Sequence, residues 1–504
     1  MLWSVSVKAS ISSSKKTEGA RRSEPRILQE VPWEVTPMQI TVALRGRARL
    51  AALLQHLEQE AGQREQGQRC DQRNRRTWRQ LILAVLVARS TRLLALGRVV
   101  AAQRRVSSVK AAAMALTYFL QTARVPVPAL SARLLETAVR DLDAEHLLTD
   151  HGQVLLVLDP TEYEQRSRER GKCGRQMEHI GRVRRSKSRP TSKQGNGPTP
   201  SPEGRRPAGK DKRVATTPGY VDIWAGLVLK GKRVLPLARQ LFSSRHPQCT
   251  SQNAVEEAVL AQALALLHRL GLRAIVLGDK GLGRKELITR LANRDQDAVL
   301  RVDADITVYP SDAPAGLLLA AALERQPWRG AVDWDRGAEG IVPCRLRTLR
   351  ATIRFSRTGR TDDVQEATVN FVEAVPLEGL TESLVLATTL PVDTVAQVRA
   401  IVRLYAQRWA IETGFETMHA WGQDAFMVRR WIAIERLLWV LAVAYALVVL
   451  TLYQRTLRAV RRQATAVLKA FSVMGNRLTV GKLAEAISLD YHEHRRAWIA
   501  AWSG

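Results

Sequence analysis

The chain has 504 residues, 45% of them hydrophobic, which is typical of a soluble globular protein and long enough for about three domains of ~150 residues each. Its 77 lysines and arginines exceed its 48 acidic residues, and the resulting net charge of +29 attracts polyanions, so nucleic acid is the expected partner. The four cysteines are scattered without a pairing motif, which argues against a disulfide-framed secreted domain and a structural zinc site.

Hydrophobic periodicity divides the first 150 residues into a tail and a helical region. Residues 1–37 are rich in Ser, Lys, Arg and Pro and predict a disordered basic tail. Between residues 38 and 150, leucines recur at one-turn spacing, as at Leu50, Leu53 and Leu57, and predict helices. These helices carry arginine clusters that fit either a DNA-binding surface or an ordinary solvated face. We interpret the region as DNA-binding, although no helix-turn-helix can be named from the pattern.

At residue 153 the pattern changes from helices to strands. The run QVLLVL (153–158) predicts a buried strand that ends at Asp159 and Pro160. Residues 164–213 contain sixteen basic and five acidic residues among clusters of Pro, Gly and Ser, and predict a disordered basic loop able to lie along a phosphate backbone. Further strands are expected at 220–229, 233–242, 273–277 and 298–302, with helices at 252–270 and 285–292.

The second half of the chain predicts a β-rich stretch followed by helices. Strand patterns at 341–346, 350–355, 367–373 and 384–388 indicate a β-rich insertion over residues 303–395, and helical patterns follow from 396 onward. The run Leu437–Leu452 is uninterrupted by charge over 16 residues, which is short of the ~20 that span a bilayer. A buried core helix is therefore favoured, and a membrane-inserted helix is the alternative.

Two aspartates and one helix carry the candidate chemistry. Asp159 and Asp279 each follow an apolar strand, and in α/β sheets active sites gather where strands end, although Asp is also common in ordinary turns. A helix is expected over residues 396–421. At ~100° per residue it places four side chains on one face, together with the rival carboxylate of Glu416. These four are Tyr405, Arg408, Glu412 and His419. Taken alone, Arg408 and Glu412 also fit a surface salt bridge.

These residues carry a resemblance to a known family. The spacing Tyr405-x2-Arg408-x3-Glu412-x6-His419 resembles the Y-x2-R-x3-E-x6-K signature of one group of DDE transposases, the cut-and-paste enzymes of bacterial insertion sequences. VLDPT around Asp159 and GDKGLGRKEL (278–287) resemble that group's two aspartate blocks, and the resemblance covers roughly residues 105–455. His419 departs from the family because it replaces a lysine that contacts DNA phosphate. The basic insertion at 164–213 is a second departure.

The resemblance implies an α/β fold with an RNase H-like mixed-sheet catalytic core. This core would comprise residues 151–302 and 396–455, interrupted by the β-rich insertion at 303–395. Helical regions would flank it at 38–150 and 456–504.

The resemblance also implies the roles of individual residues. Asp159, Asp279 and Glu412 would be catalytic and would hold two Mg²⁺ (or Mn²⁺) ions, with Asp159 bridging them, since such hard cations prefer oxygen ligands. The DNA-binding residues would be Tyr405, Arg408, His419, Thr161 and Trp328. An aromatic side chain of the insertion, Trp328 or Trp334, would receive a flipped base, although tryptophan is more often a core residue.

The implied function is cleavage and joining of DNA strands at the ends of an insertion sequence. The alternative is an inactive derivative that only binds DNA as a regulator, which the replacement at His419 motivates. The implied partners are double-stranded DNA (terminal inverted repeats and target) and a second copy of the chain in a homodimer. No stable membrane association is expected, and the implied location is the bacterial cytoplasm, at the nucleoid.

Overall fold

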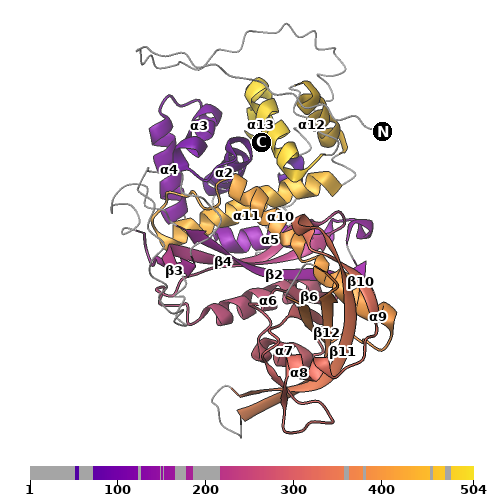
Figure 1. Cartoon of the computed structure of the whole chain (residues 1–504). Coiled ribbons are helices and arrows are strands. Elements are labelled where there is room, and N and C mark those ends of the chain that lie inside the picture. The colour runs from indigo at the N-terminus through magenta and orange to yellow at the C-terminus, as the bar shows by residue number, and fades with distance from the viewer. Residues whose placement is uncertain are drawn as a thin grey trace, which may run out of the picture. The chain divides into compact units, whose positions relative to one another are not determined.

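The computed structural model describes residues 51–55, 72–122, 126–147, 149–150, 152–164, 177–184, 216–356, 363–378, 382–453, 458–470 and 478–503 (Figure 1). The tail predicted at 1–37 and most of the basic loop predicted at 164–213 therefore lie outside the described residues.

A mixed sheet forms the centre of the fold. Its core strands are β2 (Gln153–Glu164), β4 (Thr216–Leu229), β5 (Arg233–Phe242), β6 (Ala274–Gly278) and β7 (Ala298–Arg301). They lie in the order β5-β4-β2-β6-β7, in which β5, β4 and β2 pair antiparallel and β2, β6 and β7 pair parallel. Most side chains of β4 and all of those of β6 are buried, as expected for strands covered on both faces. This sheet is the predicted RNase H-like α/β core.

β2 is longer than the sequence pattern predicted. The strand was expected to end at Asp159 and Pro160, but it continues to Glu164 because its antiparallel pairing with β4 reaches Glu164 opposite Gly219. Its parallel pairing with β6 stops earlier, at Leu158 opposite Gly278. Asp159 therefore lies within β2 but just beyond the end of the parallel ladder.

The β-rich insertion continues the same sheet. β13 (Leu384–Thr388) pairs antiparallel with β7, and β12 (Val364–Pro376), β11 (Ile341–Ser356) and β10 (Gly330–Asp335) follow outward. The two strands predicted at 341–346 and 350–355 are one strand, since the ladder between β11 and β12 runs unbroken from Cys344 to Ser356. Before them lie the hairpin of β8 (Thr307–Val308) and β9 (Leu317–Leu318), and helix α8 (Leu319–Glu324).

A short strand lies within the predicted basic loop. β3 (Gly181–Arg184) pairs with the first residues of β4, ending with Arg184 opposite Thr216. Ile180 and Val183 are buried in this segment, and Tyr220 donates a 2.6 Å hydrogen bond to the carbonyl of Glu178. The prediction of an unstructured loop is therefore wrong for residues 177–184, because the strongly charged composition of the whole segment concealed the contribution of their few apolar side chains to the core.

Helices cover both faces of the sheet, with α6 on one side of β2 and β4 and with α5, α10 and α11 on the other (Figure 1). The N-terminal elements are α2 (Gln72–Ala88), α3 (Leu93–Arg104), α4 (Val109–Thr122), α5 (Val127–Arg140), η1 (Ala144–His146) and β1 (Thr149–Asp150). Within the core and insertion lie α6 (Gln252–Arg269), α7 (Lys285–Ala292) and η3 (Gly337–Glu339). The C-terminal elements are α9 (Val395–Ala406), α10 (Trp409–Ala420), α11 (Trp431–Tyr453), α12 (Arg458–Ala470), α13 (Val480–Glu493) and α14 (Arg495–Ser503).

The single helix predicted over residues 396–421 is two helices. α9 ends at Ala406 and α10 begins at Trp409. Between them the backbone amides of Gln407, Arg408 and Ala410 bond three residues back instead of four, which tightens the chain locally. The side chains of Tyr405 and Glu412 therefore belong to different helices, and the regular spacing that suggested one face does not hold across the break.

The longest apolar helix, α11, packs inside the protein. By length and composition alone its 23 residues are enough to cross a membrane, but 83% of its most apolar stretch is buried. It contacts α2, α4, α5 and β5, so its apolar side chains face protein on all sides. This arrangement agrees with the core helix favoured from the run Leu437–Leu452.

Candidate active site

The two predicted aspartates lie side by side at the end of the parallel ladder. Leu158 of β2 is opposite Gly278 of β6, so Asp159 and Asp279 are the next residues on neighbouring parallel strands. Asp159 is 8% exposed, and Asp279 lies in the turn that follows β6. The backbone N–H of Leu282 donates a 3.2 Å hydrogen bond to Asp279 Oδ1, which orients that carboxylate. Strand register thus brings together two residues that are far apart in the sequence.

Glu412 of helix α10 is the third carboxylate, and Arg408 connects it to Asp159. Arg408, at the start of α10, donates a 2.8 Å hydrogen bond from Nη2 to Glu412 Oε1, and its Nη1 lies 3.5 Å from Asp159 Oδ2. The guanidinium is buried and stacks over the rings of Trp409, at 5.0 Å, and Tyr405, at 5.8 Å. Arg408 therefore bridges Asp159 and Glu412 instead of forming the exposed surface pair that spacing alone also allowed.

The crowded carboxylates perturb one another electrostatically. Burial raises the pKa of Asp159 to about 8, and Asp279 and Glu412 add to the rise against the opposing effect of Arg408. Burial also raises the pKa of Glu412, to which the charges of Glu416 and Asp279 contribute. Burial disfavours the Arg408 cation, but Tyr405, Asp159 and Glu412 together outweigh it and raise the arginine pKa. The site thus carries a surplus of negative charge, as a cation-binding site does.

His419 and Thr161 meet beside this cluster. His419, at the C-terminal end of α10, has Nε2 3.4 Å from Thr161 Oγ1 of β2. Its ring also lies edge-on to Tyr163, with ring centroids 6.1 Å apart. Tyr405 is 3% exposed, and burial, foremost, raises its pKa. All the residues predicted from β2, α9 and α10 therefore gather in one region of the fold.

The two tryptophans of the insertion differ in exposure. Trp328 is 48% exposed and lies under the guanidinium groups of Arg345 and Arg347, at 6.0 and 5.0 Å from the ring centroid. Trp334 is 5% exposed and belongs to the core. Gly337, which follows β10, lies close to the start of α10, since a Cβ on this residue would lie 3.2 Å from the ring of Trp409. Trp328 lies at the opposite end of β10, so the exposed ring is the one farther from the break between α9 and α10.

The donor set fits hard divalent cations. Asp159, Asp279 and Glu412 offer only carboxylate oxygens, which Mg²⁺ and Mn²⁺ prefer. Burial is the main cause of the raised pKa of Asp159, and the neighbouring carboxylates Asp279 and Glu412 add to it. Among the described residues, one group of three His, Cys, Asp or Glu side chains has ligand atoms within 4.8 Å of one another, and it is not this one. The carboxylate oxygens of Asp159, Asp279 and Glu412 are therefore not all within that distance of one another. Arg408 lies between two of the carboxylates, in contact with Asp159 and Glu412.

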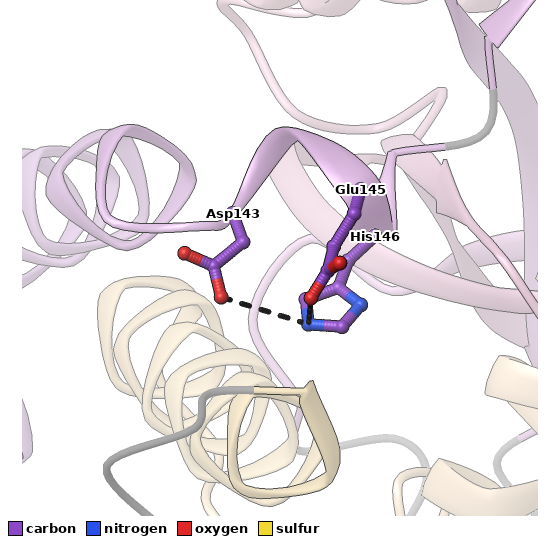
Figure 2. Close-up of side chains that lie close together, drawn as sticks. All are labelled: Asp143, Glu145 and His146. Carbon is purple, nitrogen blue, oxygen red and sulfur yellow. Dashed lines mark ion pairs between the residues drawn. The ribbon is translucent and has the colours of Figure 1, made fainter.

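The group that meets this distance is Asp143, Glu145 and His146 at η1 (Figure 2). His146 Nε2 is 3.8 Å from Asp143 Oδ2 and 3.7 Å from Glu145 Oε1. Both carboxylates are exposed. η1 lies before β2 in the chain, and β2 itself begins six residues before Asp159. The group is therefore separate from the predicted carboxylate site.

A buried polar network behind the site was missed from the sequence. Asp222 of β4 and Arg239 of β5 form a fully buried bidentate ion pair, with Arg239 Nη2 2.6 Å from Asp222 Oδ1. Tyr163 donates a 2.7 Å hydrogen bond to the same carboxylate and accepts one from Gln423, after α10. Asp222 within apolar β4 and Arg239 in the interior of β5 were the available signal, because buried charges require partners.

Comparison with known proteins supports the class that this fold and site indicate. Residues 243–447, less than half of the 504, match the family model described as the transposase DDE domain. The match includes Asp279 and Glu412 and begins after Asp159. It supports a place among the DDE transposases, which act on DNA in transposition and recombination. No curated protein matches the chain.

Proposed function

We propose that the protein is a transposase that cuts and joins DNA strands at the ends of an insertion sequence, using Asp159, Asp279 and Glu412 as ligands of two divalent ions. The observation that carries the proposal is the position of Asp159 and Asp279 directly after the paired ends of the parallel ladder between β2 and β6, with Arg408 connecting Asp159 to Glu412. The family match over residues 243–447 supports it independently.

The divalent ions, when bound, supply an activated water and neutralise charge on the leaving oxygen of the phosphodiester. The chain's own residues then have distinct tasks. Arg408 and His419 hold backbone phosphates, and the Tyr405 hydroxyl donates to a phosphate oxygen. Buried surroundings keep Tyr405 protonated and able to donate, since its pKa is raised. Trp328 offers an exposed ring for a flipped base. We place the protein in the cytoplasm, on DNA, with homodimer formation when two ends are paired.

A cleavage assay tests the proposal. Purified protein is incubated with a labelled duplex that carries the DNA bordering its own gene, with Mn²⁺ or Mg²⁺ and with EDTA as control. We expect end-specific cuts that disappear in Asp159→Ala, Asp279→Ala and Glu412→Gln, while DNA binding in EDTA is retained. Cutting that persists in any one of these variants removes that residue from the site. Loss in Glu416→Gln but not in Glu412→Gln identifies Glu416 as the third carboxylate.

The second candidate function is an inactive derivative that only binds DNA. The observation that favours it is His419, because an imidazole stands where the family signature has lysine, and an imidazole is in general a weaker base than an ammonium group's amine. Binding without cutting supports this candidate. His419→Lys then distinguishes the two causes: restored cutting assigns the loss to this residue, and continued inactivity assigns it elsewhere.

A further inference from the structure

The corner between α2 and α3 has the geometry of a helix-turn-helix. The two helices meet at 116° across residues 89–92. DNA-binding units of this type join their helices at about 90–120° through a turn of three or four residues. Arg89 has a left-handed backbone (φ 44°), which reverses the chain directly after α2. We infer that α2 and α3 form the DNA-reading unit of this protein, with α3 in the major groove. This inference rests on the proposed function.

The outer face of α3 carries side chains suited to reading bases. Leu94 is 58% exposed, and Arg98, one turn later, is also exposed, while Leu96 and Val100 are buried on the inner face. Residues near the start of the second helix contact base edges in such units. Arginine bonds guanine through two donors, and an apolar side chain contacts the methyl group of thymine. Arg98 and Leu94 therefore fit adjacent base pairs.

Close packing holds α3 in place for this role. A Cβ on Gly97 would lie 2.9 Å from the carbonyl oxygen of Val109, so α3 and α4 approach closely because this residue is glycine. Thr77 and Gln80 of α2 accept hydrogen bonds from Arg104 at the end of α3, at 3.0 and 2.8 Å. The exposed face of α3 is thus presented by a rigid support.

The first helix supplies the charge for the DNA backbone. In such units the first helix crosses the phosphates. Arg73, Arg75 and Arg76 lie in the first turns of α2, and burial followed by the charges of Arg76 and Arg73 lowers the pKa of Arg104. Positive charges therefore gather where the start of α2 meets the end of α3, as expected where phosphates supply the counter-charge.

The turn is joined directly to the catalytic helix. Thr91, fully buried in the turn, donates a hydrogen bond from Oγ1 to the carbonyl of Gly422, two residues after α10 ends. A cavity of about 680 Å³ lies at this junction, lined by Arg89 of the turn, Glu416 and Thr417 of α10, and Lys482 of α13. DNA that is read by α3 is therefore held at a fixed position relative to the helix that carries Glu412.

Selection from a random duplex library tests the inference. The full-length protein selects duplexes in EDTA, so that binding is measured without cleavage. We expect the wild-type protein to enrich one sequence. Arg98→Ala should lose preference at one or two adjacent base pairs, by about tenfold, and keep it elsewhere. Leu94→Ala should relax a neighbouring position. Methylation of guanine N7, which lies in the major groove, should block wild-type binding at the position that Arg98→Ala no longer reads.

Matched variants separate base reading from charge. Arg294→Ala, an exposed arginine after α7, should leave both the selected sequence and the affinity unchanged. Arg75→Ala with Arg76→Ala should weaken binding to all duplexes and lower the salt slope by about 1.8, at 0.9 per phosphate contact. The inference is overturned if the wild-type protein enriches no sequence, or if Arg98→Ala and Leu94→Ala both select the wild-type sequence. A protein that selects a sequence but never cuts refutes the proposed function and leaves this inference intact.

Discussion

At the scale of single residues, Arg408 organises the carboxylate site. Its guanidinium contacts Asp159 and Glu412 at 3.5 and 2.8 Å, and its side chain is only 9% exposed. In the proposed two-ion site, a buried cation between two carboxylates would supply the charge that a divalent ion supplies when bound, so arginine and ion would compete for the same oxygens. Release of Arg408 from the carboxylates would leave it available to a DNA phosphate, which is the role that the resemblance to DDE transposases assigns to it.

The competition predicts opposite effects of one substitution on two measurements. Arg408→Gln should bind Mn²⁺ at least about tenfold more tightly, since a buried positive charge near the ion is removed, yet it should lose DNA cleavage. Calorimetric titration with Mn²⁺ in the absence of DNA measures the affinity. Arg403→Gln, exposed on α9, is the matched control and should leave both quantities unchanged. Weaker Mn²⁺ binding by Arg408→Gln would show that the arginine orients the carboxylates instead of competing for them.

The raised pKa of Asp159 predicts how stability depends on pH. The carboxyl group has a pKa of about 8 in the folded protein against 3.8 ordinarily, so between these values the folded state binds the extra proton. Stability should therefore fall as pH rises from about 5 to 8 in EDTA. Asp159→Asn should flatten the dependence and added Mn²⁺ should weaken it, whereas Asp305→Asn, at an exposed position, should do neither. Melting temperatures across this range measure the effect, and identical slopes for wild type and Asp159→Asn would contradict it.

The candidate carboxylates were accessible from the sequence, but their surroundings were not. Asp159, Asp279 and Glu412 follow recognisable strands or a spaced motif. The partners Tyr163, Asp222 and Arg239 share no motif, because register between β2, β4 and β5 alone brings them together.

At the scale of elements, the break between α9 and α10 illustrates the same limit. Gln407 and Arg408 are ordinary helix formers, so propensity predicts that one helix continues. The break coincides with the residue whose side chain contacts Asp159 of β2, and the chain tightens there through backbone bonds three residues back. Strands whose bounds follow local sequence patterns were predicted more accurately, since β5 and β13 have the predicted bounds. The extent of β2 and β11, in contrast, depends on pairing with strands that are distant in the sequence.

The hydrogen bond that links the α2–α3 turn to the residue after α10 predicts an effect of removing the buried hydroxyl of Thr91. Thr91→Val keeps the side-chain volume but removes the donor to Gly422, which leaves a partly buried carbonyl unpaired at about 1–3 kcal/mol or less. We expect the sequence selected in EDTA to be unchanged and the rate of end cleavage to fall about ten- to hundredfold, because the cut site is no longer held in position.

The control for this prediction is Thr117→Val. Thr117 donates to Ala113 within α4, so its loss removes a similar hydrogen bond without touching the junction. Wild-type cleavage by Thr91→Val at a temperature where the variant is folded would show that the turn and the catalytic helix are not coupled.

At the scale of the whole molecule, the sheet joins parts that the sequence presents as separate. The insertion at 303–395 was predicted from its strands, but its pairing through β13 onto β7 was not, because long-range pairing leaves no local pattern. Helix α11 is likewise buried by helices that come before residue 150 in the sequence and by helices that come after it. Its burial therefore reflects contacts between the two ends of the chain. The family resemblance supplied the core topology that periodicity alone could not.

The ladder of β3 and β4 gives a precise way to test the basic insertion. Arg184 and Thr216 are directly paired, so the two residues that flank 185–215 lie side by side. They hold nine basic and two acidic residues. Replacing all of them by Asn-Gly, which closes a two-residue hairpin, should preserve β3 and its contacts.

This replacement should weaken DNA binding in a way that depends on salt. If the nine cations contact phosphates, the slope of log affinity against log salt decreases by up to about 8, at 0.9 per contact, and a decrease of at least about 2 is expected. Binding measured in EDTA from about 50 to 200 mM salt gives the slope. The sequence selected from a random library should not change, because phosphate contacts carry no base information. An unchanged slope would mean that the insertion does not contact DNA, and a changed selected sequence would mean that it reads bases.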